Sequence, residues 1–299
     1  MKTIDIDHIN INDRRFCISY PMYDSTLLSS INKIGIIQPV ILLNTMPYVV
    51  ITGFKRTLTA IQAGFTKIPS VIVDVSEKDA LLYAIHDNIK RGLNIVEKGH
   101  CIERMLHMGF SLTEIHETMI LLSLDPHEKI VERLTAVADM EDTFKAFITT
   151  KGIAMKQVEM LMYFSSEERS EIIDILTSIH TTESFIREIL ELLNLVKIKK
   201  GGIDFDSLKN VPDAQELKKI LKKLVNPILV SLEEELKRIK LLCALSPDID
   251  IKVDPFFEKG YIDMLIRAKT EDKAKDAIEK LRNILNKGYI RSILELTRG

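Results

Sequence analysis

Hydrophobic and polar positions along the first 95 residues follow two different periods. Three short runs, "QPVILLN", "YVVITG" and "PSVIVDV", are rich in β-branched residues and bounded by Pro, Gly or Asn, which predicts strands. Between and after them, apolar residues return every three or four positions, which predicts helices. In "KRTLTAIQAGF" this spacing places Leu58, Ile61 and Phe65 on one helical face. Strands that alternate with helices indicate an α/β domain over residues 1–95.

The helical period continues almost without interruption from residue 96 to residue 197. The segments "IVEKGHCIERMLHMGF", "DPHEKIVERLTAVADM" and "TESFIREILELLNLVKI" each carry apolar residues at spacings of three and four. Asp125, Pro126 and Glu128 together form a strong helix start. We therefore expect an all-helical domain over residues 96–197.

The last third of the chain changes its period. The segment "KIKKGGIDFDS" at 197–207 is a candidate linker, because a charge run is followed by two glycines. Residues 213–245 predict a long helix that Pro227 kinks or splits. "DIKVDPFF" and "YIDMLIRA" alternate like strands, and "TEDKAKDAIEKLRNILNKG" predicts an amphipathic helix. Residues 198–299 are therefore expected to form a small C-terminal α/β module that mediates dimerisation.

Composition allows two or three domains with buried cores. The 299 residues are 46% hydrophobic and 28% charged, a balance that excludes a disordered chain. No run of about 18 apolar residues occurs, so no membrane span is predicted. Cys17, Cys101 and Cys243 are far apart in the sequence, which is typical of free thiols in a reducing compartment. We therefore expect a cytoplasmic protein.

The net charge of −2 is unevenly distributed. Residues 96–197 carry 10 Lys and Arg against 18 Asp and Glu, whereas residues 198–299 carry 21 against 17. DNA binding draws much of its affinity from cations that contact phosphates. The excess of negative charge in the helical domain thus disfavours DNA binding there, and the lysine-rich stretch 218–240 is an alternative surface for contact with nucleic acid. Such a charge run is also typical of a plain solvated face.

The turn that follows "YVVIT" has the features of a phosphate site. Gly53 allows the backbone to approach a ligand closely. The first turn of the helix that follows presents unpaired N–H groups and the positive end of the helix dipole. Lys55 and Arg56 add full charges there, and the planar guanidinium suits phosphate oxygens. The alternative is a solvated surface turn with ordinary cations.

A second polar cluster occurs in "HDNIKRGLN", at residues 86–94. Asp87, Asn88 and Arg91 are spaced at i, i+1 and i+4. Carboxylate and amide oxygens are ligands suited to Mg²⁺, which usually binds one or two protein oxygens plus substrate phosphates. Arg91, one turn later, is placed to bind a phosphate. The alternative is a helix end stabilised by an Asp–Arg pair.

Three segments of the chain resemble the ParB/RepB-like partition protein family. "SSINKIGIIQPVILL", "GFKRTLTAIQAGFTKIPSVIV" and "DNIKRGLNIVEKG" follow in the order and rough spacing of that family's motifs. Those motifs read S-I-x-x-x-G-x-x-Q-P, then G-E-R-R-x-x-A-A-x-x-A-G-x-x-x-I-P, then E-N-x-x-R with L-N-x-x-E soon after. The resemblance is close over residues 28–100 and extends to residue 197 in character only. It implies a ParB/sulfiredoxin-like N-terminal domain followed by a helix-turn-helix (HTH) domain.

The resemblance also implies ligands, partners and site residues. The family binds CTP with Mg²⁺ and closes as a clamp on DNA. The resemblance therefore implies a homodimer and a ParA-like ATPase partner. Carried over position by position, the nucleotide-binding residues are Gln38, Gly53, Lys55, Arg56, Asn88 and Arg91, and the metal ligands are Asp87 and Asn88. Lys55 replaces the first Arg of G-E-R-R, which keeps the charge but loses the bidentate fork.

Phe54 departs from the family pattern in a way that affects chemistry. It stands where the family has the Glu of G-E-R-R, so we expect nucleotide binding rather than turnover and at most a weak CTPase activity. It also stands where the related sulfiredoxins have a nucleophilic cysteine. Thiolate chemistry therefore has no evident nucleophile at this turn.

The candidate HTH lies in "SLTEIHETMILLSLDPHEKIVERLTAV", residues 111–137, and its second helix is expected to begin at Asp125-Pro126. The resemblance implies DNA contacts from this second helix. The candidate residues are His127, Lys129 and Arg133. Glu128 and Glu132 would face phosphates badly, so the alternative is a helical bundle that keeps HTH packing without the function.

The sequence thus predicts a ParB-like partition, segregation or regulatory protein that binds a nucleotide and associates with DNA. Two other classes remain open. One is a phosphotransferase or nuclease on the same fold, which would need a general base that the sequence does not single out. The other is a non-catalytic interaction protein with a degenerate pocket.

Overall fold

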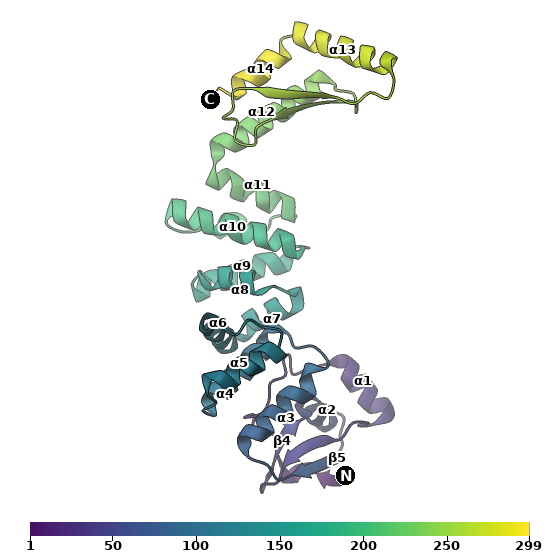
Figure 1. Cartoon of the computed structure of the whole chain (residues 1–299), viewed down its shortest axis with the longest axis vertical. Coiled ribbons are helices and arrows are strands. Elements are labelled where there is room, and N and C mark those ends of the chain that lie inside the picture. Colours follow the sequence, from purple (N-terminus) through teal and green to yellow (C-terminus); the bar gives the residue numbers. More distant parts are fainter. Residues whose placement is uncertain (299) are drawn as a thin grey trace. The chain divides into compact units, whose positions relative to one another are not determined.

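The computed structural model describes residues 1–298, which divide into two compact units. The N-terminal unit, Met1–Thr177, combines a mixed sheet with helices, and the C-terminal unit begins at Ser178 (Figure 1). None of the helices that the structure describes is long and apolar enough to cross a membrane. Cys17, Cys101 and Cys243 are free, as predicted, and all three are buried.

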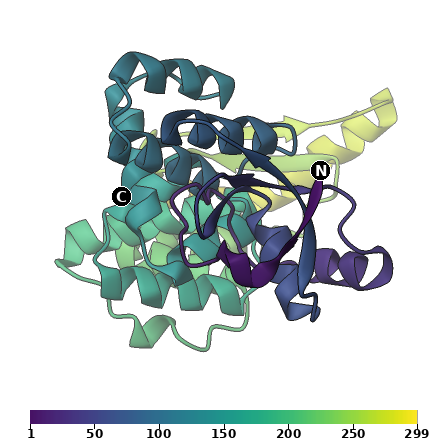
Figure 2. The ribbon, with the colours of Figure 1, turned by 90° about the horizontal axis from the view of Figure 1, so that it is seen from below.

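Five strands form the sheet of the N-terminal unit. Their order is β1 (Lys2–Asp5), β5 (Lys67–Val73), β3 (Val40–Leu43), β4 (Tyr48–Thr52) and β2 (Ile9–Asn10). β3 pairs parallel to β5 and antiparallel to β4. Figure 2 shows β1 running from the labelled N-terminus along one edge of this sheet. The three predicted strands are confirmed as β3, β4 and β5, whereas the short strands β1 and β2 were not predicted.

Three helices accompany this sheet, and side-chain caps mark the starts of two of them. They are α1 (Ser25–Ile34), α2 (Phe54–Gln62) and α3 (Glu77–Ile89). The side chain of Asp24 accepts hydrogen bonds from the first-turn amides of α1, and Ser76 accepts one from the N–H of Asp79 at the start of α3. Leu81 and Ile85 of α3 are fully buried in the larger core cluster.

Helix α2 buries a different face from the one that its hydrophobic spacing predicts. Ile61 is 36% exposed and Phe65 is 38% exposed, so the predicted face is partly in solvent. The buried positions are Phe54, Thr57, Thr59 and Ala60. Phe54 is only 4% exposed and lies in a core cluster with Val40 and Ile68. The prediction was wrong because burial of this first-turn aromatic ring orients the helix.

The helical stretch after α3 is confirmed. Its members in the N-terminal unit are α4 (Ile95–His107), α5 (Leu112–Leu121), α6 (Glu128–Asp139), α7 (Asp142–Lys151), α8 (Met155–Met162) and α9 (Ser166–Ser178). The backbones of α4 and α6 approach each other closely at Gly99. A Cβ at this position would lie only 2.6 Å from the carbonyl oxygen of Leu134, so the close approach requires glycine.

α6 begins later than Asp125-Pro126, where it was predicted to start. His127 has an extended backbone and its ring Nδ1 accepts a hydrogen bond from the N–H of Lys129, 3.2 Å away. This side chain is therefore the N-cap, and the helix begins at Glu128.

Among its described residues the C-terminal unit contains five complete α-helices, a short 3-10 helix at Asp206–Leu208 and one hairpin. The helices and strands are α10 (Glu183–Lys200), α11 (Ala214–Val225), α12 (Pro227–Cys243), β6 (Ile249–Val253), β7 (Ile262–Ile266), α13 (Glu271–Asn286) and α14 (Tyr289–Leu296). The predicted split at Pro227 is confirmed. α10 runs to Lys200, so the first four residues of the candidate linker 197–207 are helical. The division into 1–95, 96–197 and 198–299 stays a prediction.

The hairpin of the C-terminal unit has one apolar face that is only partly covered. β6 and β7 pair antiparallel, with Ile251 opposite Met264 and Ile249 opposite Ile266. Ile249 and Ile251 are buried, whereas Met264 is 45% exposed and Ile266 is 38% exposed. The apolar surface of β7 is therefore available for contact with another molecule.

Candidate functional site

A cleft of about 540 Å³ lies where the first turn of α2, the end of α3 and the segment before β3 meet. It is lined by every residue predicted to hold the nucleotide or its metal: Gln38, Gly53, Lys55, Arg56, Asp87, Asn88 and Arg91. Ser19, Leu27 and Lys90 also line the cleft and were not predicted. Residues from three separate sequence motifs thus converge on one concave surface.

Gly53 forms the turn between β4 and α2. Its φ of 93° lies in the left-handed region, where a side chain is disfavoured. A Cβ at this position would lie 2.8 Å from Cγ1 of Val40 and 3.2 Å from the guanidinium carbon of Arg56. Gly53 cannot cap α2 with a side chain, so the N–H groups of the first turn remain open to an anion.

Arg56 is held in place by the backbone that precedes β3. Its Nη1 donates to the carbonyl oxygens of Gln38, at 2.6 Å, and Pro39, at 2.9 Å. Its Nη2 lies 3.7 Å from a carboxylate oxygen of Asp87. Burial lowers the pKa of Arg56 from its ordinary value, and the Asp87 charge partly offsets that effect. Arg56 therefore fixes the shape of the cleft as well as supplying charge.

Lys55 is the cation of this turn that is available to a ligand. Its side chain is half-buried at the cleft, and within residues 1–298 it makes no hydrogen bond or ion pair. Lys90 adds a further, exposed cation at the same cleft. The cleft therefore combines an open helix N-terminus with two lysine side chains, which is a chemistry suited to a polyphosphate.

Arg91 is engaged by a residue that the sequence analysis did not assign. Its Nη1 and Nη2 donate to the two carboxylate oxygens of Glu97, at 3.0 and 2.5 Å, and its Nε donates to Oδ1 of Asn88 at 3.0 Å. The Glu97 side chain is fully buried, whereas that of Arg91 is 41% exposed. Glu97 is the last residue of the L-N-x-x-E motif, so the signal that could have identified it was present in "LNIVE".

The metal candidates differ in how available they are. Both polar atoms of Asn88 already have protein partners, because its Nδ2 donates to the carbonyl oxygen of Ala84 at 2.7 Å and its Oδ1 accepts from Arg91. Asp87 keeps a partly exposed carboxylate beside Arg56. Residues 1–298 contain no group of three or more His, Cys, Asp or Glu side chains placed to hold a metal. Asp87 still fits Mg²⁺, because that ion needs one or two protein oxygens when phosphates supply the rest.

Phe54 lies at the floor of the cleft and offers it no polar group. It packs into the core beneath the sheet-to-helix turn and is 4% exposed. The position that carries the family's glutamate therefore contributes to the core in this chain. No acid or base stands there to act on a bound phosphate.

The three DNA candidates on and beside α6 are placed differently from one another. His127 is exposed, but its Nδ1 is used as the cap of α6. Arg133 is half-buried and forms an ion pair with Glu159 of α8 at 2.8 Å. Lys129 is exposed and makes no ion pair with any described residue. Of the three, Lys129 is thus best placed to contact a phosphate.

Comparison with known proteins supports the sequence resemblance. Residues 2–89 match the family model of the ParB N-terminal domain. A relative from Vibrio cholerae, described as a probable chromosome-partitioning protein ParB, is 28% identical over 201 residues, which cover 66% of this chain and 64% of the relative. The match therefore spans less than two thirds of that relative's length.

Two solved structures of ParB from Caulobacter crescentus, both C-terminally truncated, also match. One is complexed with CTP-gamma-S, with a TM-score of 0.27, 14% identity and coverage of 62% of this chain and 96% of that chain. The other is complexed to the centromeric parS site, with a TM-score of 0.33, 13% identity and coverage of 75% and 100%. Both scores are below 0.5, so these likenesses carry no argument about this chain.

The domain match identifies the N-terminal part of the chain, and over 201 residues the chain is similar to a ParB-like partition protein. Residues 2–89 of this chain are a ParB N-terminal domain, as the three ordered motifs predicted.

Proposed function

We propose that this chain is a partition or segregation protein whose N-terminal domain binds a nucleoside triphosphate, CTP with Mg²⁺, in the cleft at the start of α2. The observation that carries the proposal is the convergence of all the motif residues on that one cleft. The open amides of α2 and the side chain of Lys55 would hold the phosphates. Asp87 would hold the metal, and the segment at Gln38 would lie beside the nucleoside.

Binding without efficient turnover is the activity that fits this cleft. Hydrolysis needs a group that positions or activates water near the terminal phosphate. Phe54 supplies none, and the carboxylate of Asp87 lies beside Arg56 and would be shared with the metal. The nucleotide would then act as a ligand that shifts the population of conformations of the helices beyond Arg91. We expect this to happen in the cytoplasm.

Calorimetric titration of CTP, ATP and GTP, each with Mg²⁺, tests the nucleotide proposal on the full chain. Lys55→Ala removes a cation that holds nothing else in the structure, so its loss should weaken binding while the fold is unchanged. Lys33→Ala, an exposed lysine of α1 outside the cleft, is the matched control. Arg56→Ala should abolish binding, because it removes both a charge and the tether to Gln38 and Pro39. If no nucleotide binds, the cleft is only a basic surface turn.

DNA is the macromolecular partner that we propose. The exposed lysine of α6 and the lysine-rich helix α11 offer two distinct contact surfaces, and phosphate contacts make affinity depend on salt. Fluorescence anisotropy of a labelled duplex, with and without CTP, should therefore compare Lys129→Ala with Lys223→Ala, both exposed lysines. Loss of one phosphate contact should lower the salt slope by about 1. If neither variant changes the slope, both surfaces are excluded.

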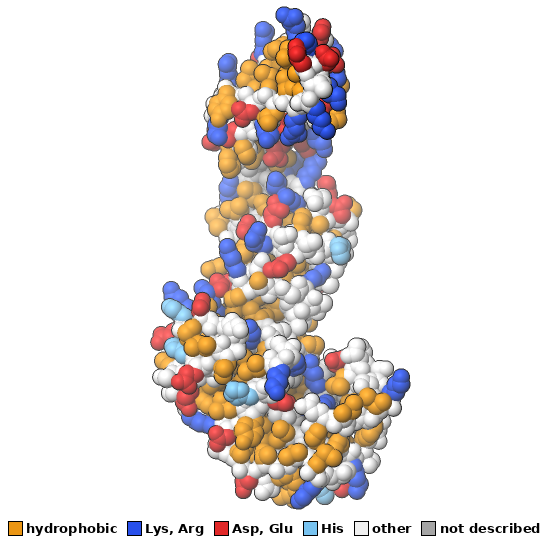
Figure 3. Space-filling view, turned by 45° about the vertical axis from the view of Figure 1, so that its right-hand side comes forward, with side chains coloured by type: hydrophobic (Ala, Val, Ile, Leu, Met, Phe, Trp, Pro, Cys, Tyr) orange, Lys and Arg blue, Asp and Glu red, His pale blue; other side chains and the backbone are white. Residues whose placement is uncertain are grey.

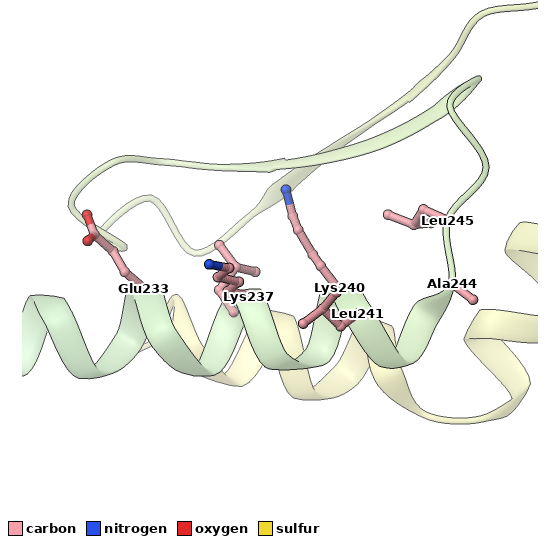
Figure 4. Close-up of a pocket in the computed structure, with 7 residues that line it drawn as sticks. Glu233, Lys237, Lys240, Leu241, Ala244 and Leu245 are labelled. Atoms are coloured by element: carbon pink, nitrogen blue, oxygen red, sulfur yellow. The ribbon is translucent and has the colours of Figure 1, made fainter. Parts of the chain in front are cut away.

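A second copy of this chain is the partner that we propose for the C-terminal unit, with a ParA-like ATPase as a further partner of the assembly. Met264 and Ile266 leave the apolar face of β7 partly exposed, and the same face of a second copy would cover it. Figure 3 shows hydrophobic side chains exposed among Lys and Arg on this unit. A groove of about 450 Å³ runs along α12, from which Lys240 extends toward the hairpin and approaches Asp250 at 3.6 Å (Figure 4).

Sedimentation of the full chain tests this dimer. Met264→Lys places a charge on the exposed apolar face of β7 and should yield a monomer. Ile228→Lys, which replaces an apolar residue that is 72% exposed at the start of α12, is the control. A dimer that survives Met264→Lys would remove the hairpin from the interface.

The rival activity is that of a phosphotransferase or nuclease on the same fold. Asp87 is the one carboxylate among the described residues that line the cleft, so it is the candidate base. Product formation that Asp87→Asn abolishes while nucleotide affinity is retained would favour this rival. The third alternative, an interaction protein with a degenerate pocket, is favoured if no nucleotide binds.

A further inference from the structure

The guanidinium of Arg91 is nearly saturated by acceptors of the protein itself. It donates to both carboxylate oxygens of Glu97, to Oδ1 of Asn88 and, at 3.4 Å, to the carbonyl oxygen of Gly92. A guanidinium has five N–H donors, so one remains for a ligand. A phosphate that binds Arg91 in the usual bidentate way must therefore displace Glu97.

Loss of the ion pair with Arg91 would force the groups around the Glu97 carboxylate to rearrange. Its side chain is fully buried, and its carboxylate also accepts hydrogen bonds from the backbone N–H groups of Tyr20, at 3.0 Å, and Asn94, at 3.1 Å. A buried carboxylate that loses its counter-ion is strongly unfavourable, so the groups around it must rearrange or admit water.

The groups that surround Glu97 belong to the start of α4 and to the loop before α1. Asn94 caps α4, and its Nδ2 donates to the carbonyl oxygen of Tyr20 at 2.8 Å. The hydroxyl of Tyr20 donates in turn to the carbonyl oxygen of Asp142, the first residue of α7, at 3.1 Å. Two residues beyond Glu97, Gly99 holds α4 against the backbone of α6. The Glu97 carboxylate thus connects the cleft to the start of α4 and, through Tyr20, to α7.

We propose that Glu97 is a positioning residue that competes with the phosphates of the bound ligand for Arg91. Phosphate oxygens would take the guanidinium from Glu97, and the released carboxylate would loosen the hydrogen bonds of Tyr20 and the start of α4. This inference rests on the proposed function, because it requires a polyphosphate in the cleft. It identifies the contact through which ligand binding would affect the helices that follow α3.

Calorimetry on the full chain with two probes, CTP with Mg²⁺ and inorganic tripolyphosphate, tests the competition. Glu97→Gln keeps the shape of the side chain and one acceptor but weakens its hold on Arg91. It should bind tripolyphosphate at least about 5-fold more tightly than the wild type, a typical coupling between linked sites. The gain should vanish in the double variant with Arg91→Ala. Glu103→Gln, another α4 carboxylate paired with an arginine, is the matched control.

Hydrogen exchange of the unaltered chain provides a second test that needs no variant. Saturating tripolyphosphate should speed exchange of the backbone amides of Tyr20 and Asn94, which donate to Glu97 in the structure. Exchange that is unchanged or slower on binding would overturn the inference.

The outcomes separate this inference from the proposed function. If CTP binds Glu97→Gln and Glu103→Gln as it binds the wild type, the inference fails and nucleotide binding stands. If tripolyphosphate shows the gain but no nucleotide binds, the competition stands and the nucleotide proposal fails. If neither probe binds any variant, both fail.

Discussion

The close approach at Gly53 makes a quantitative prediction for Gly53→Ala. The added methyl group would meet Cγ1 of Val40, which is fully buried on β3, and the guanidinium of Arg56. A side chain in the left-handed region is disfavoured by about 1 to 2 kcal/mol. Overpacking a filled core adds about 1 to 3 kcal/mol. We therefore expect a loss of about 2 to 5 kcal/mol in the free energy of unfolding.

Gly64→Ala separates these two effects. Gly64 has a φ of 80°, at the other end of α2, and a Cβ there would meet nothing within 4 Å. It should lose only the backbone contribution, about 1 to 2 kcal/mol. Native-state hydrogen exchange of peptides from β3 and β4 measures both losses in the full chain. Gly53→Ala should also weaken CTP binding, because it pushes Arg56 from its carbonyl partners. Equal losses in the two variants would refute close packing at Gly53.

Three further predictions follow from other contacts. Arg91→Ala should lower the free energy of unfolding by about 3 kcal/mol, because it leaves Glu97 buried and unpaired, and Glu97→Gln in the same chain should restore most of that loss; urea unfolding that shows no restoration contradicts the buried pair. Burial lowers the pKa of His100 to about 4, so the unfolded chain binds more protons between pH 6.5 and pH 4 and stability falls as the pH falls through that range. Urea unfolding at pH 7 and pH 5 should show a loss of about 2 kcal/mol that His100→Asn removes, and an unchanged slope would refute it. Gly99→Ala should separate α4 from α6 and lower the melting temperature of the full chain; an unchanged temperature would show that the helices shift without penalty.

The elements of this fold were largely predictable because local signals agree with tertiary contacts. The strands β3, β4 and β5 are bounded by Pro, Gly or Asn, and Ser76 caps α3 as its spacing with Asp79 predicted. The face of α2 was not predictable from period alone, because burial of Phe54 at the first position outweighs the exposed Ile61. Strands β1 and β2 are too short to carry a periodic signal.

The sequence predicted which residues line the candidate cleft but not how they contact one another, and their roles stay a prediction. The motif spacing brought Gly53, Lys55 and Arg91 to one cleft. Sequence spacing could not show that Arg56 donates two hydrogen bonds to the carbonyl oxygens of Gln38 and Pro39, or that Arg91 forms an ion pair with Glu97. These are long-range or side-chain-specific choices that depend on the packed geometry.

The burial of Phe54 has a consequence for how this site can change over generations. A single substitution of Phe54 by Glu would insert a carboxylate among Val40 and Ile68 and remove an aromatic ring from the core. The intermediate would fold poorly before any new chemistry could be selected. A change to an acidic residue at this turn would first require the core beneath α2 to be refilled, so the packing of this phenylalanine opposes the gain of a carboxylate at the cleft.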